Sequence, residues 1–464
     1  MSPALLAGRR YRAAFALAAL CCVAILVGGY ATAGADASLA RSDSAGEADN
    51  RTNDTVVPPR DNVTVVATDS TAFVTDVGDG PRKRAELVAF APNGSVYYRD
   101  ESHTRYWDVD PVAGTAATVE YVYADHLAPE DCSSGSACTR NGVERVNLTS
   151  GNVTRVYSRI TPGKHSTRWH DADRIGEDRL LVADIDQDRA FVVNTTTEQL
   201  TWSWDAQTDF NTSSGGSYPE DWTHINDVEY VELDGRETVM VSVRNHDQVV
   251  FVDTETGLRE NWTLGSDGDH DTLYEQHNPD FIPAERGGPA VLVADSENGR
   301  VVEYQRRNGS WERSWEWRDQ RLTWVRDADR LPNGHTLITD SNGDRVLEVA
   351  RNGSVVWSST VGFPYESERL GTGDESAGGR SAAALGLPAR TPSAENRSAV
   401  SETTTLLPKP LVNGVAYLLP AWVGPVEALA AVGLVVVLLV WAVVEWRRRS
   451  FEVHLRWPVQ IRNR

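Results

Sequence analysis

The segment "YPEDWTHINDVEYV", residues 218–231, carries several chemically competent side chains at the start of a strand-like run. His224 and Asn226 lead this run, Trp222 precedes them, and Asp227 follows directly. Imidazole, carboxamide and carboxylate groups can form turns, ligate a metal or take part in a reaction centre. Related segments elsewhere in the chain help to distinguish between a turn, a metal site and a reaction centre.

Four similar units begin at residues 170, 226, 277 and 326, so that successive starts lie 56, 51 and 49 residues apart. The units start "HDADRIGEDRLLVADIDQDRAFVV", "NDVEYVELDGRETVMVSVRNHDQVVFV", "HNPDFIPAERGGPAVLVADSENGRVVEY" and "RDADRLPNGHTLITDSNGDRVLEV". Each contains three short apolar strands separated by turns, and a fourth strand bearing tryptophan, with Trp262 in this role in the second unit. Short strands at this period are typical of β-propeller blades. Two weaker units upstream raise the predicted number of blades to six, in an all-β fold.

The first strand of each propeller blade lines the central channel, so the four unit starts should converge at one mouth. Their first residues are His170, Asn226, His277 and Arg326, with His224 two positions before Asn226. Imidazole, amide and guanidinium donors that face one space form an anion site. We therefore expect a negatively charged ligand at this mouth.

One unit differs from the others at the end of its second strand. Three units carry Asp184, Asp295 or Asp340 there, whereas we align Arg244, in "VSVRNHD", with these aspartates in the remaining unit. A reversal of charge at an equivalent position indicates a local need for a cation. This supports the anion site.

Two metal-binding readings compete with this interpretation. A zinc site could be built from His170, His224 and His277, but Arg244 nearby would repel the cation. The runs "DIDQD" (184–188) and "DSNGD" (340–344) resemble calcium loops. They also occupy hairpin turns, where Asp and Asn are favoured for conformational reasons. We expect no metal.

The motifs "WHDAD", "DWTHIND", "VSVRNHD" and "EQHNPDF", in this order, resemble the bacterial arylsulfate sulfotransferases over roughly residues 85–360. The resemblance implies a six-bladed propeller that moves a sulfuryl group from an aryl sulfate donor to a phenolic acceptor. It implies that His277 is transiently sulfated and that His224, Asn226 and Arg244 bind the sulfate. His170 matches a further channel histidine. The N-terminal β domain that those enzymes use for dimerisation has no counterpart here, which leaves the oligomeric state open.

A histidine nucleophile splits a difficult transfer into two easier steps, and no cofactor is expected. Fixed donors would stabilise the charge on the sulfuryl oxygens, and one histidine would exchange a proton with the phenol. Two alternatives remain: a non-catalytic propeller that binds an anion or glycan, and a quinone-cofactor dehydrogenase. The missing glycine-rich tryptophan repeat of quinoproteins argues against the latter.

The formal net charge is −21, and the only lysines are Lys83, Lys164 and Lys409. An acidic surface with few lysines is typical of haloarchaeal-like proteins that work in high salt. It argues against nucleic acid as a partner, because binding phosphates requires a basic face.

Both ends of the chain carry an apolar run next to arginines, at residues 13–33 and 428–444. Each run is long enough, or nearly so, to span a membrane, and the arginine clusters predict cytoplasmic termini. The first run could instead be a cleaved signal peptide. The predicted segments are an N-terminal anchor or signal (1–34), a disordered linker (35–60), an extracellular propeller (61–363), a linker with a juxtamembrane part (364–420), a transmembrane helix (421–446) and a cytoplasmic basic tail (447–464).

An extracellular setting has two further consequences. Cys132 and Cys138 flank a Ser/Gly loop, and we expect a disulfide between them rather than two free thiols. N-x-S/T sequons, for example at Asn62 and Asn308, are candidate glycan sites in an exported protein.

Overall fold

The computed structural model describes residues 3–41, 54–70, 85–163, 167–319, 322–373, 375, 377–390, 409–419, 423–448, 451–454 and 460–463. The chain forms two compact units. Residues 46–419 form one unit, and the terminal segments, residues 1–45 and 420–464, form the other. Each unit is described by itself.

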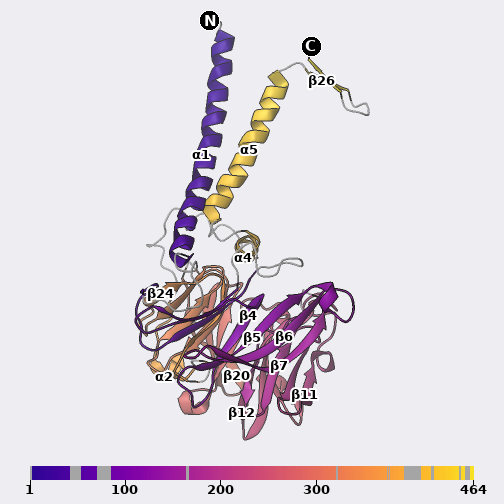
Figure 1. Ribbon diagram of the computed structural model, residues 1–464, viewed down its shortest axis with the longest axis vertical. Helices are drawn as coiled ribbons and strands as arrows, with labels where there is room; N and C mark the ends of the chain where they lie inside the picture. Colours follow the sequence, from indigo (N-terminus) through magenta and orange to yellow (C-terminus); the bar gives the residue numbers. More distant parts are fainter. Residues whose placement is uncertain are drawn as a thin grey trace. The chain divides into compact units, whose positions relative to one another are not determined.

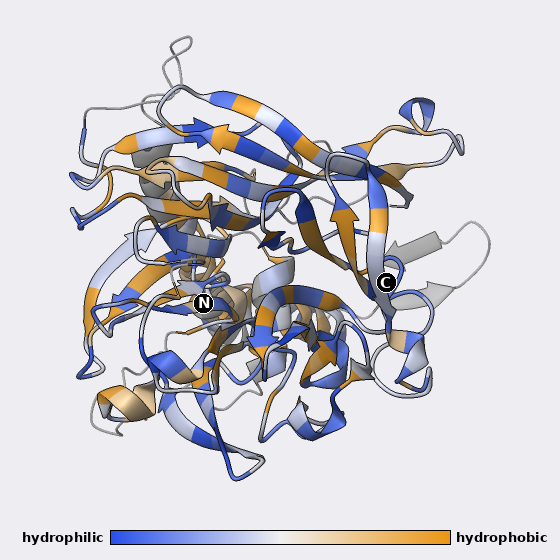
Figure 2. Ribbon diagram, turned by 90° about the horizontal axis from the view of Figure 1, so that it is seen from below, coloured by the Kyte–Doolittle hydropathy of each residue, from blue (hydrophilic) through white to orange (hydrophobic). Residues whose placement is uncertain are grey.

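The larger unit is an all-β propeller of six antiparallel blades, as the sequence predicts (Figures 1 and 2). Blade 1 contains β25 (Pro364–Arg369), β1 (Thr64–Thr68), β2 (Leu87–Phe90) and β3 (Val96–Asp100). Blade 2 contains β4 (Arg105–Pro111), β5 (Thr118–Leu127), β6 (Cys138–Asn147) and β7 (Asn152–Pro162). Blade 3 contains β8 (Arg174–Ile175), β9 (Arg179–Asp184), β10 (Arg189–Asn194) and β11 (Gln199–Asp205).

The remaining three blades follow in chain order. Blade 4 contains β12 (Ile225–Leu233), β13 (Arg236–Val243), β14 (Gln248–Asp253), β15 (Gly257–Leu258) and β16 (Leu264–Gly265). Blade 5 contains β17 (His277–Ile282), β18 (Ala290–Asp295), β19 (Arg300–Arg307) and β20 (Ser310–Trp317). Blade 6 contains β21 (Val325–Arg330), β22 (Thr336–Asp340), β23 (Arg345–Val349) and β24 (Val355–Thr360). Two short helices, α2 (Ala382–Leu385) and α4 (Lys409–Leu418), belong to the same unit.

Blade 4 departs from the predicted pattern at its outer edge. Trp262, expected on a fourth strand, ends the 3-10 helix η4 (Glu260–Trp262) between the two-residue strands β15 and β16. Its indole still packs in the apolar core between blades 4 and 5.

The propeller is closed by a strand from beyond its predicted end. The inner strand of blade 1, β25, pairs with β1 near the start of the propeller. The sequence pattern predicted that the propeller ends at residue 363 and that residues 364–420 form a linker with a juxtamembrane part. The structure instead places residues 364–369 in the sheet, so that pairing between two distant chain segments closes the circle.

Packing between blades builds the core. The strands alternate between hydrophobic and hydrophilic residues (Figure 2). Six buried apolar clusters form, each shared by one pair of adjacent blades. Fully burying one Val, Leu, Ile or Phe side chain contributes roughly 1.5–3 kcal/mol. The inner strands are held in place by these clusters.

Most inner strands contain a β-bulge near their N-terminal end. The pairing register shifts between Tyr106 and Val109 in β4, between Ile225 and Asp227 in β12, and between Val325 and Asp327 in β21. Corresponding shifts occur in β17 and opposite β25. A bulge leaves a residue outside the ladder and re-aims its side chain. In β12, β21 and β25 the single residue outside the ladder is Asn226, Arg326 and Tyr365, respectively.

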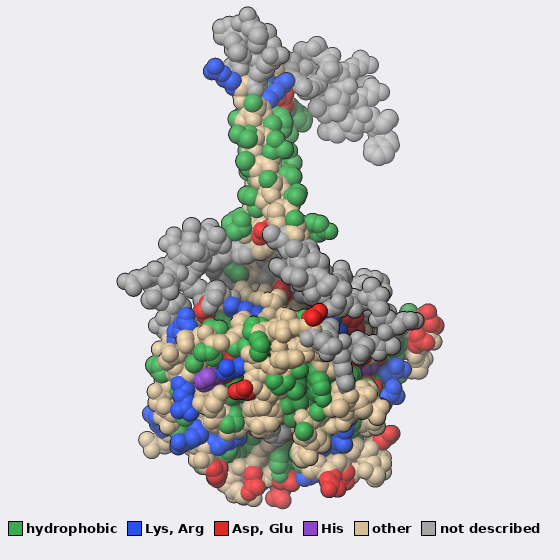
Figure 3. All heavy atoms as spheres, turned by 60° about the vertical axis from the view of Figure 1, so that its left-hand side comes forward, with side chains coloured by type: hydrophobic (Ala, Val, Ile, Leu, Met, Phe, Trp, Pro, Cys, Tyr) green, Lys and Arg blue, Asp and Glu red, His purple; other side chains and the backbone are tan. Residues whose placement is uncertain are grey.

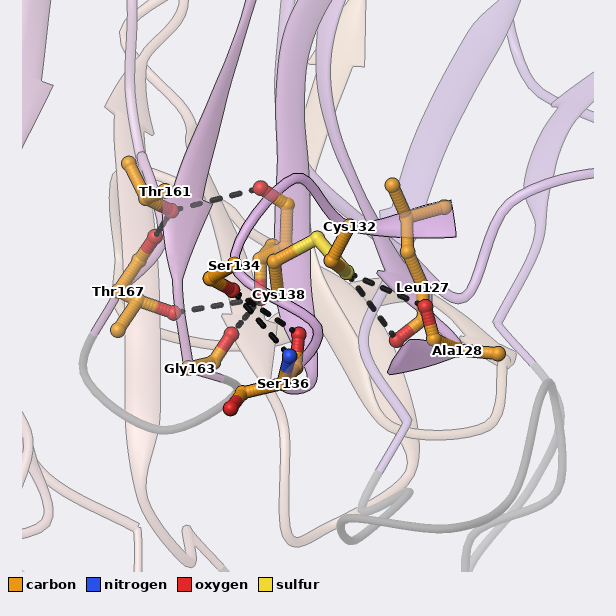
Figure 4. The surroundings of a disulfide bond; sticks show 10 residues. Leu127, Ala128, Cys132, Ser134, Ser136, Cys138, Thr161, Gly163 and Thr167 are labelled. Carbon is orange, nitrogen blue, oxygen red and sulfur yellow. Dashed lines mark hydrogen bonds between the residues drawn. A yellow bond between two sulfur atoms is a disulfide. The ribbon is translucent and has the colours of Figure 1, made fainter. Parts of the chain in front are cut away.

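A disulfide joins Cys132 to Cys138 in blade 2 (Figure 4). Cys138 begins β6 and pairs with Leu127 at the end of β5, so the bond lies in the connection between these two strands. Within the enclosed loop, the Ser134 hydroxyl donates a hydrogen bond to the carbonyl oxygen of Ser136 (3.3 Å). The disulfide therefore closes a short loop at one end of this blade.

We expect non-reduced peptides of the native protein to contain Cys132 and Cys138 linked to each other. The closed loop is short, so replacing both residues by serine should lower the free energy of unfolding by only about 2 kcal/mol. Peptide mass spectrometry and denaturant unfolding test the two statements. Recovery of both cysteines as free thiols from protein purified without reductant would contradict the first.

The smaller unit contains the helices α1 (Pro3–Arg41) and α5 (Pro425–Arg448) and the hairpin β26 (Phe451–His454) and β27 (Gln460–Asn463). Residues 10–31 and 426–448 are long and apolar enough to cross a membrane. Hydrophobic side chains are exposed along the helical part of this unit (Figure 3). Arg12 forms an ion pair with Glu445 (2.6 Å), and Phe15 stacks on Trp441. The two helices are therefore antiparallel, with the N-terminal end of one beside the C-terminal end of the other.

Candidate active site

One residue from each inner strand, or from the segment leading into it, lines the channel at the bulges. We call this set the mouth ring; it consists of Trp107, His170, Asn226, His277, Arg326 and Tyr365. The six residues are equivalent because strand pairing aligns their flanking positions in every blade. All six are buried. The structure thus brings together the four unit starts that the repeats predicted and adds two aromatic residues.

Sequence reasoning missed Trp107 and Tyr365. Tyr365 lies beyond the predicted end of the propeller, and Trp107 lies in one of the weaker units. A signal was nevertheless present, because an acid-x-acid triplet follows both residues, in "WDVD" and "YESE", as it does in "HDAD" and "RDAD".

His277 is held in a defined tautomer. Its Nδ1 lies 3.1 Å from the carbonyl oxygen of Glu275 and 2.8 Å from the hydroxyl oxygen of Ser296. A carbonyl oxygen can only accept a hydrogen bond, so Nδ1 carries the proton and Nε2 keeps its lone pair. Burial, together with the charges of Arg326 and Arg244, lowers the pKa of His277 well below its usual value. The imidazole is therefore neutral near pH 7, as a nucleophile must be.

His170 lies among aromatic rings. It stacks on Trp107 with 4.0 Å between ring centroids, and its Nδ1 lies 3.2 Å from the Tyr365 hydroxyl. Its Nε2 is buried and has no hydrogen-bond partner among the described residues. Burial and the neighbouring His224 lower the pKa of His170 well below its usual value. A buried nitrogen without a partner is a position where a ligand could supply one.

His224 stands beside the mouth ring, two positions before Asn226. Its ring centroid lies 5.1 Å from that of His170, and its Nδ1 lies 2.7 Å from Oδ1 of Asp221. Burial and Arg244 lower its pKa, whereas Asp221 opposes the shift. The carboxylate fixes the orientation of the ring, which leaves Nε2 for a ligand.

His224 has a φ of 47°, in the left-handed region. The equivalent residues of blades 5, 6 and 1 also have φ angles in this region: Glu275 (46°), Trp324 (63°) and Phe363 (50°). Non-glycine residues with such backbone angles are uncommon and cluster at functional sites. The feature recurs two positions before the mouth ring in four blades, so the fold imposes it.

Asn226 links two blades. Its Nδ2 donates a hydrogen bond to the carbonyl oxygen of Gln276 (2.8 Å), the residue before His277. Its Oδ1 is buried without a partner among the described residues. Trp222, which precedes His224 and Asn226 in the sequence, packs against Tyr218 and His246.

The structure corrects the alignment of Arg244. Val243 pairs with Gln248 across its hairpin, just as Asp184, Asp295 and Asp340 pair with arginines across theirs. Val243 is therefore the counterpart of the three aspartates. Arg244 occupies the next position, where the other three units have Ile185, Ser296 and Ser341. Arg244 is still the only charged residue among these four equivalent positions, although its counterparts are isoleucine and serine rather than aspartate.

Arg244 lies close to the ring and to solvent. It donates a hydrogen bond through Nη2 to Oε2 of Glu275 (2.8 Å), and its Nε has no partner among the described residues. It also lines a pocket of about 430 Å³ together with Asp221, Tyr274 and Glu275. This volume would hold a small aromatic molecule. A larger cavity, of about 600 Å³, is lined by residues further along the inner strands, such as Glu229 and Leu233. His170, His224 and His277 line neither of these two cavities.

The two metal-binding readings find no support among the described residues. There, no group of three potential ligand atoms includes His170, His224 or His277. In the hairpin turns, Asp184 pairs with Arg189 and Asp340 with Arg345. The first aspartate of each run thus pairs with an arginine across its hairpin. Two cations, three imidazoles and an amide at one mouth favour an anionic ligand.

Fold and site together define a six-bladed β-propeller whose channel mouth gathers imidazole, guanidinium and amide groups. A family model described as arylsulfotransferase (ASST) matches residues 192–362, which supports that family. No curated protein matches the chain.

Among solved structures, a protein of unknown function from Bacteroides caccae has a TM-score of 0.44 at 11% identity, with 66% of this chain and 97% of that chain covered. A periplasmic gluconolactonase from Pseudomonas aeruginosa has a TM-score of 0.42 at 14% identity, with 67% and 99% covered. A virginiamycin B lyase from Staphylococcus aureus has a TM-score of 0.37 at 7% identity, with 68% and 87% covered. We draw no functional conclusion from these similarities.

Proposed function

We propose that this protein is an aryl sulfotransferase that moves a sulfuryl group from an aryl sulfate to a phenolic acceptor through a sulfated His277. The observation that carries the proposal is the tautomer of His277. Its Nδ1 proton is directed to the Glu275 carbonyl, so the Nε2 lone pair is available. A neutral imidazole beside two guanidinium groups suits attack on an anionic sulfur centre.

In the first half-reaction, Nε2 of His277 attacks sulfur, the bond from sulfur to the aryl oxygen breaks, and the leaving phenolate takes a proton from His224. In the second, an acceptor phenol returns a proton to His224, its oxygen attacks sulfur, and the nitrogen–sulfur bond breaks. Arg244, Asn226 and His170 are assigned to the sulfuryl oxygens. Of the three site histidines, His224 alone is paired with a carboxylate. We assign His224 the proton exchange with the phenol, in addition to stabilising the transferring group.

The full-length protein in detergent and molar salt, mixed with an aryl sulfate and a second phenol, should release the first phenol and sulfate the second. The His277→Ala variant is the matched control. Binding of the aryl sulfate without turnover by the unmodified protein would favour the alternative, a membrane-tethered propeller that only binds an anion or glycan.

We further propose that both termini are cytoplasmic and that the propeller lies outside the cell. The antiparallel pairing of α1 and α5 supports termini on one side of a membrane. Arginines 9, 10 and 12 and arginines 447–449 follow the positive-inside rule. The disulfide suits an oxidising compartment.

Protease added to intact cells should therefore remove most of residues 54–390 while leaving a C-terminal epitope tag intact. Immunoblotting before and after lysis measures the loss of the propeller and the survival of the tag. Protection of the propeller until the cells are lysed would contradict the topology.

A further inference from the structure

One step further along each inner strand, or along the segment leading into it in blade 3, lies a second ring beyond the mouth ring, which we call the acid ring. Blades 1, 2, 3, 4 and 6 contribute an acidic residue and blade 5 an asparagine: Glu366, Asp108, Asp171, Asp227, Asp327 and Asn278. All six side chains are buried. Five carboxylates thus share one layer of a narrow channel.

Four of these carboxylates have a hydrogen-bond partner in the next blade. Each accepts an N–H from the inner strand of the next blade, at the position after that blade's own acid-ring residue. Asp108 accepts from Ala172 (3.1 Å) and Asp171 from Val228 (2.7 Å). In the same way, Asp327 accepts from Ser367 (3.1 Å) and Glu366 from Val109 (3.2 Å).

Asp227 cannot follow this scheme. The residue that should donate to it is Pro279, which has no N–H. Asp227 is 9% exposed, and its Oδ1 is buried without a hydrogen-bond partner among the described residues. A buried carboxylate without a partner is strongly unfavourable unless something else compensates its charge.

Asn278 is a second exception in the same sector. It is 9% exposed, and its Nδ2 donates to Oε2 of Glu366 (2.9 Å). Its Oδ1 is buried and has no partner among the described residues. An acidic residue and an amide oxygen therefore stand unpartnered in this layer, next to the other carboxylates.

The remaining geometry suits a cation. One ligand atom each from Asp108, Asp171 and Glu366 lies within 4.8 Å of the other two. Ligands on opposite sides of calcium are roughly 4.6–5.2 Å apart, twice the usual Ca–O distance. The available donors are all oxygens, which hard cations prefer over zinc.

Buried carboxylates that share one layer repel one another unless a positive charge compensates them. A cation among them would compensate several carboxylates at once and could also coordinate the amide oxygen of Asn278.

We propose that the acid ring binds one calcium-sized divalent cation through Asp108, Asp171 and Glu366, with Asp227 and Asn278 completing its oxygen shell. The three principal ligands come from blades 2, 3 and 1, so the ion ties the closing strand β25 to its neighbours. Its role is structural and independent of the sulfuryl transfer. It also compensates the negative charge next to His277 and His170.

Elemental analysis of the full-length protein, purified in molar NaCl and detergent without chelator, should find one calcium per chain. Treatment with EDTA should lower the Tm, and 1 mM CaCl₂ should restore it more fully than MgCl₂ at the same concentration. Calcium binding by the chelated protein is then measured by titration calorimetry.

Two variants and a control separate this site from other sources of calcium binding. Asp227→Asn removes a charge but no hydrogen bond, so the variant should fold and bind calcium about tenfold or more weakly. Asn278→Asp adds a charge and should tighten binding. Asp186→Asn, in the calcium-loop-like "DIDQD" hairpin, should change nothing. A Tm that responds to pH or NaCl but not to calcium would overturn the proposal, as would weaker binding in the Asp186 variant alone.

Discussion

Replacing His277 by alanine is expected to abolish both turnover and the covalent intermediate. When the unmodified enzyme is mixed with an aryl sulfate in the absence of an acceptor, the sulfated form should accumulate, because a two-step mechanism stops there. Digestion at neutral or alkaline pH should then show a sulfuryl mass addition on the peptide that contains His277. The His277→Ala protein should show no adduct and no transfer above background.

The other histidines provide the contrast. In the His224→Ala variant the adduct should form more slowly, by about 10²–10⁴-fold if His224 provides general acid catalysis, but on the same peptide. In the unmodified enzyme, an adduct on His224 or His170 instead of His277 would show that the assignment of the nucleophile is wrong. Because nitrogen–sulfur adducts are acid-labile, samples have to be kept above neutral pH.

The environment of His277 also fixes the direction of its pH dependence. Burial and the nearby Arg326 and Arg244 lower its pKa, so the nucleophilic neutral form persists below pH 6.5. The rate of adduct formation should therefore decline only at pH values below those at which an exposed histidine is protonated.

Replacing Arg244 by serine is expected to lower kcat/KM for an aryl sulfate by about 10²–10³-fold, the usual effect of removing one fixed donor to a developing negative charge. Serine is the residue at the equivalent position of blades 5 and 6, so the hairpin should tolerate it. The Arg244→Lys variant should recover part of the activity, because it restores the charge but not the planar pair of donors.

Arg236→Ser is the matched control, since Arg236 is exposed and pairs with Asp253 at the far end of the same strand, β13. This variant should keep full activity, and all three variants should unfold at similar temperatures. If Arg244→Ser turned over aryl sulfates normally, the anion-site hypothesis would be wrong.

The sequence by itself determined the blades. Apolar alternation, turn residues and a repeat near 50 residues are local features, and they predicted strands, hairpins and a six-bladed fold that the structure confirms. The repeats also selected four members of the mouth ring, because equivalent positions in a repeat occupy equivalent places in space. The apolar terminal segments were likewise visible, since length and composition alone define a helix able to span a membrane.

Tertiary structure alone decided how the circle closes and what its centre contains. The pairing of β25 with β1 joins residues about 300 positions apart, and no local pattern specifies it. That pairing brings Tyr365 into the mouth ring and Glu366 into the acid ring. The pairing of Val243 with Gln248 likewise moved Arg244 one position from its sequence alignment. Register and closure depend on which strands pair and where bulges fall, because a shift of one residue turns a side chain to the opposite face.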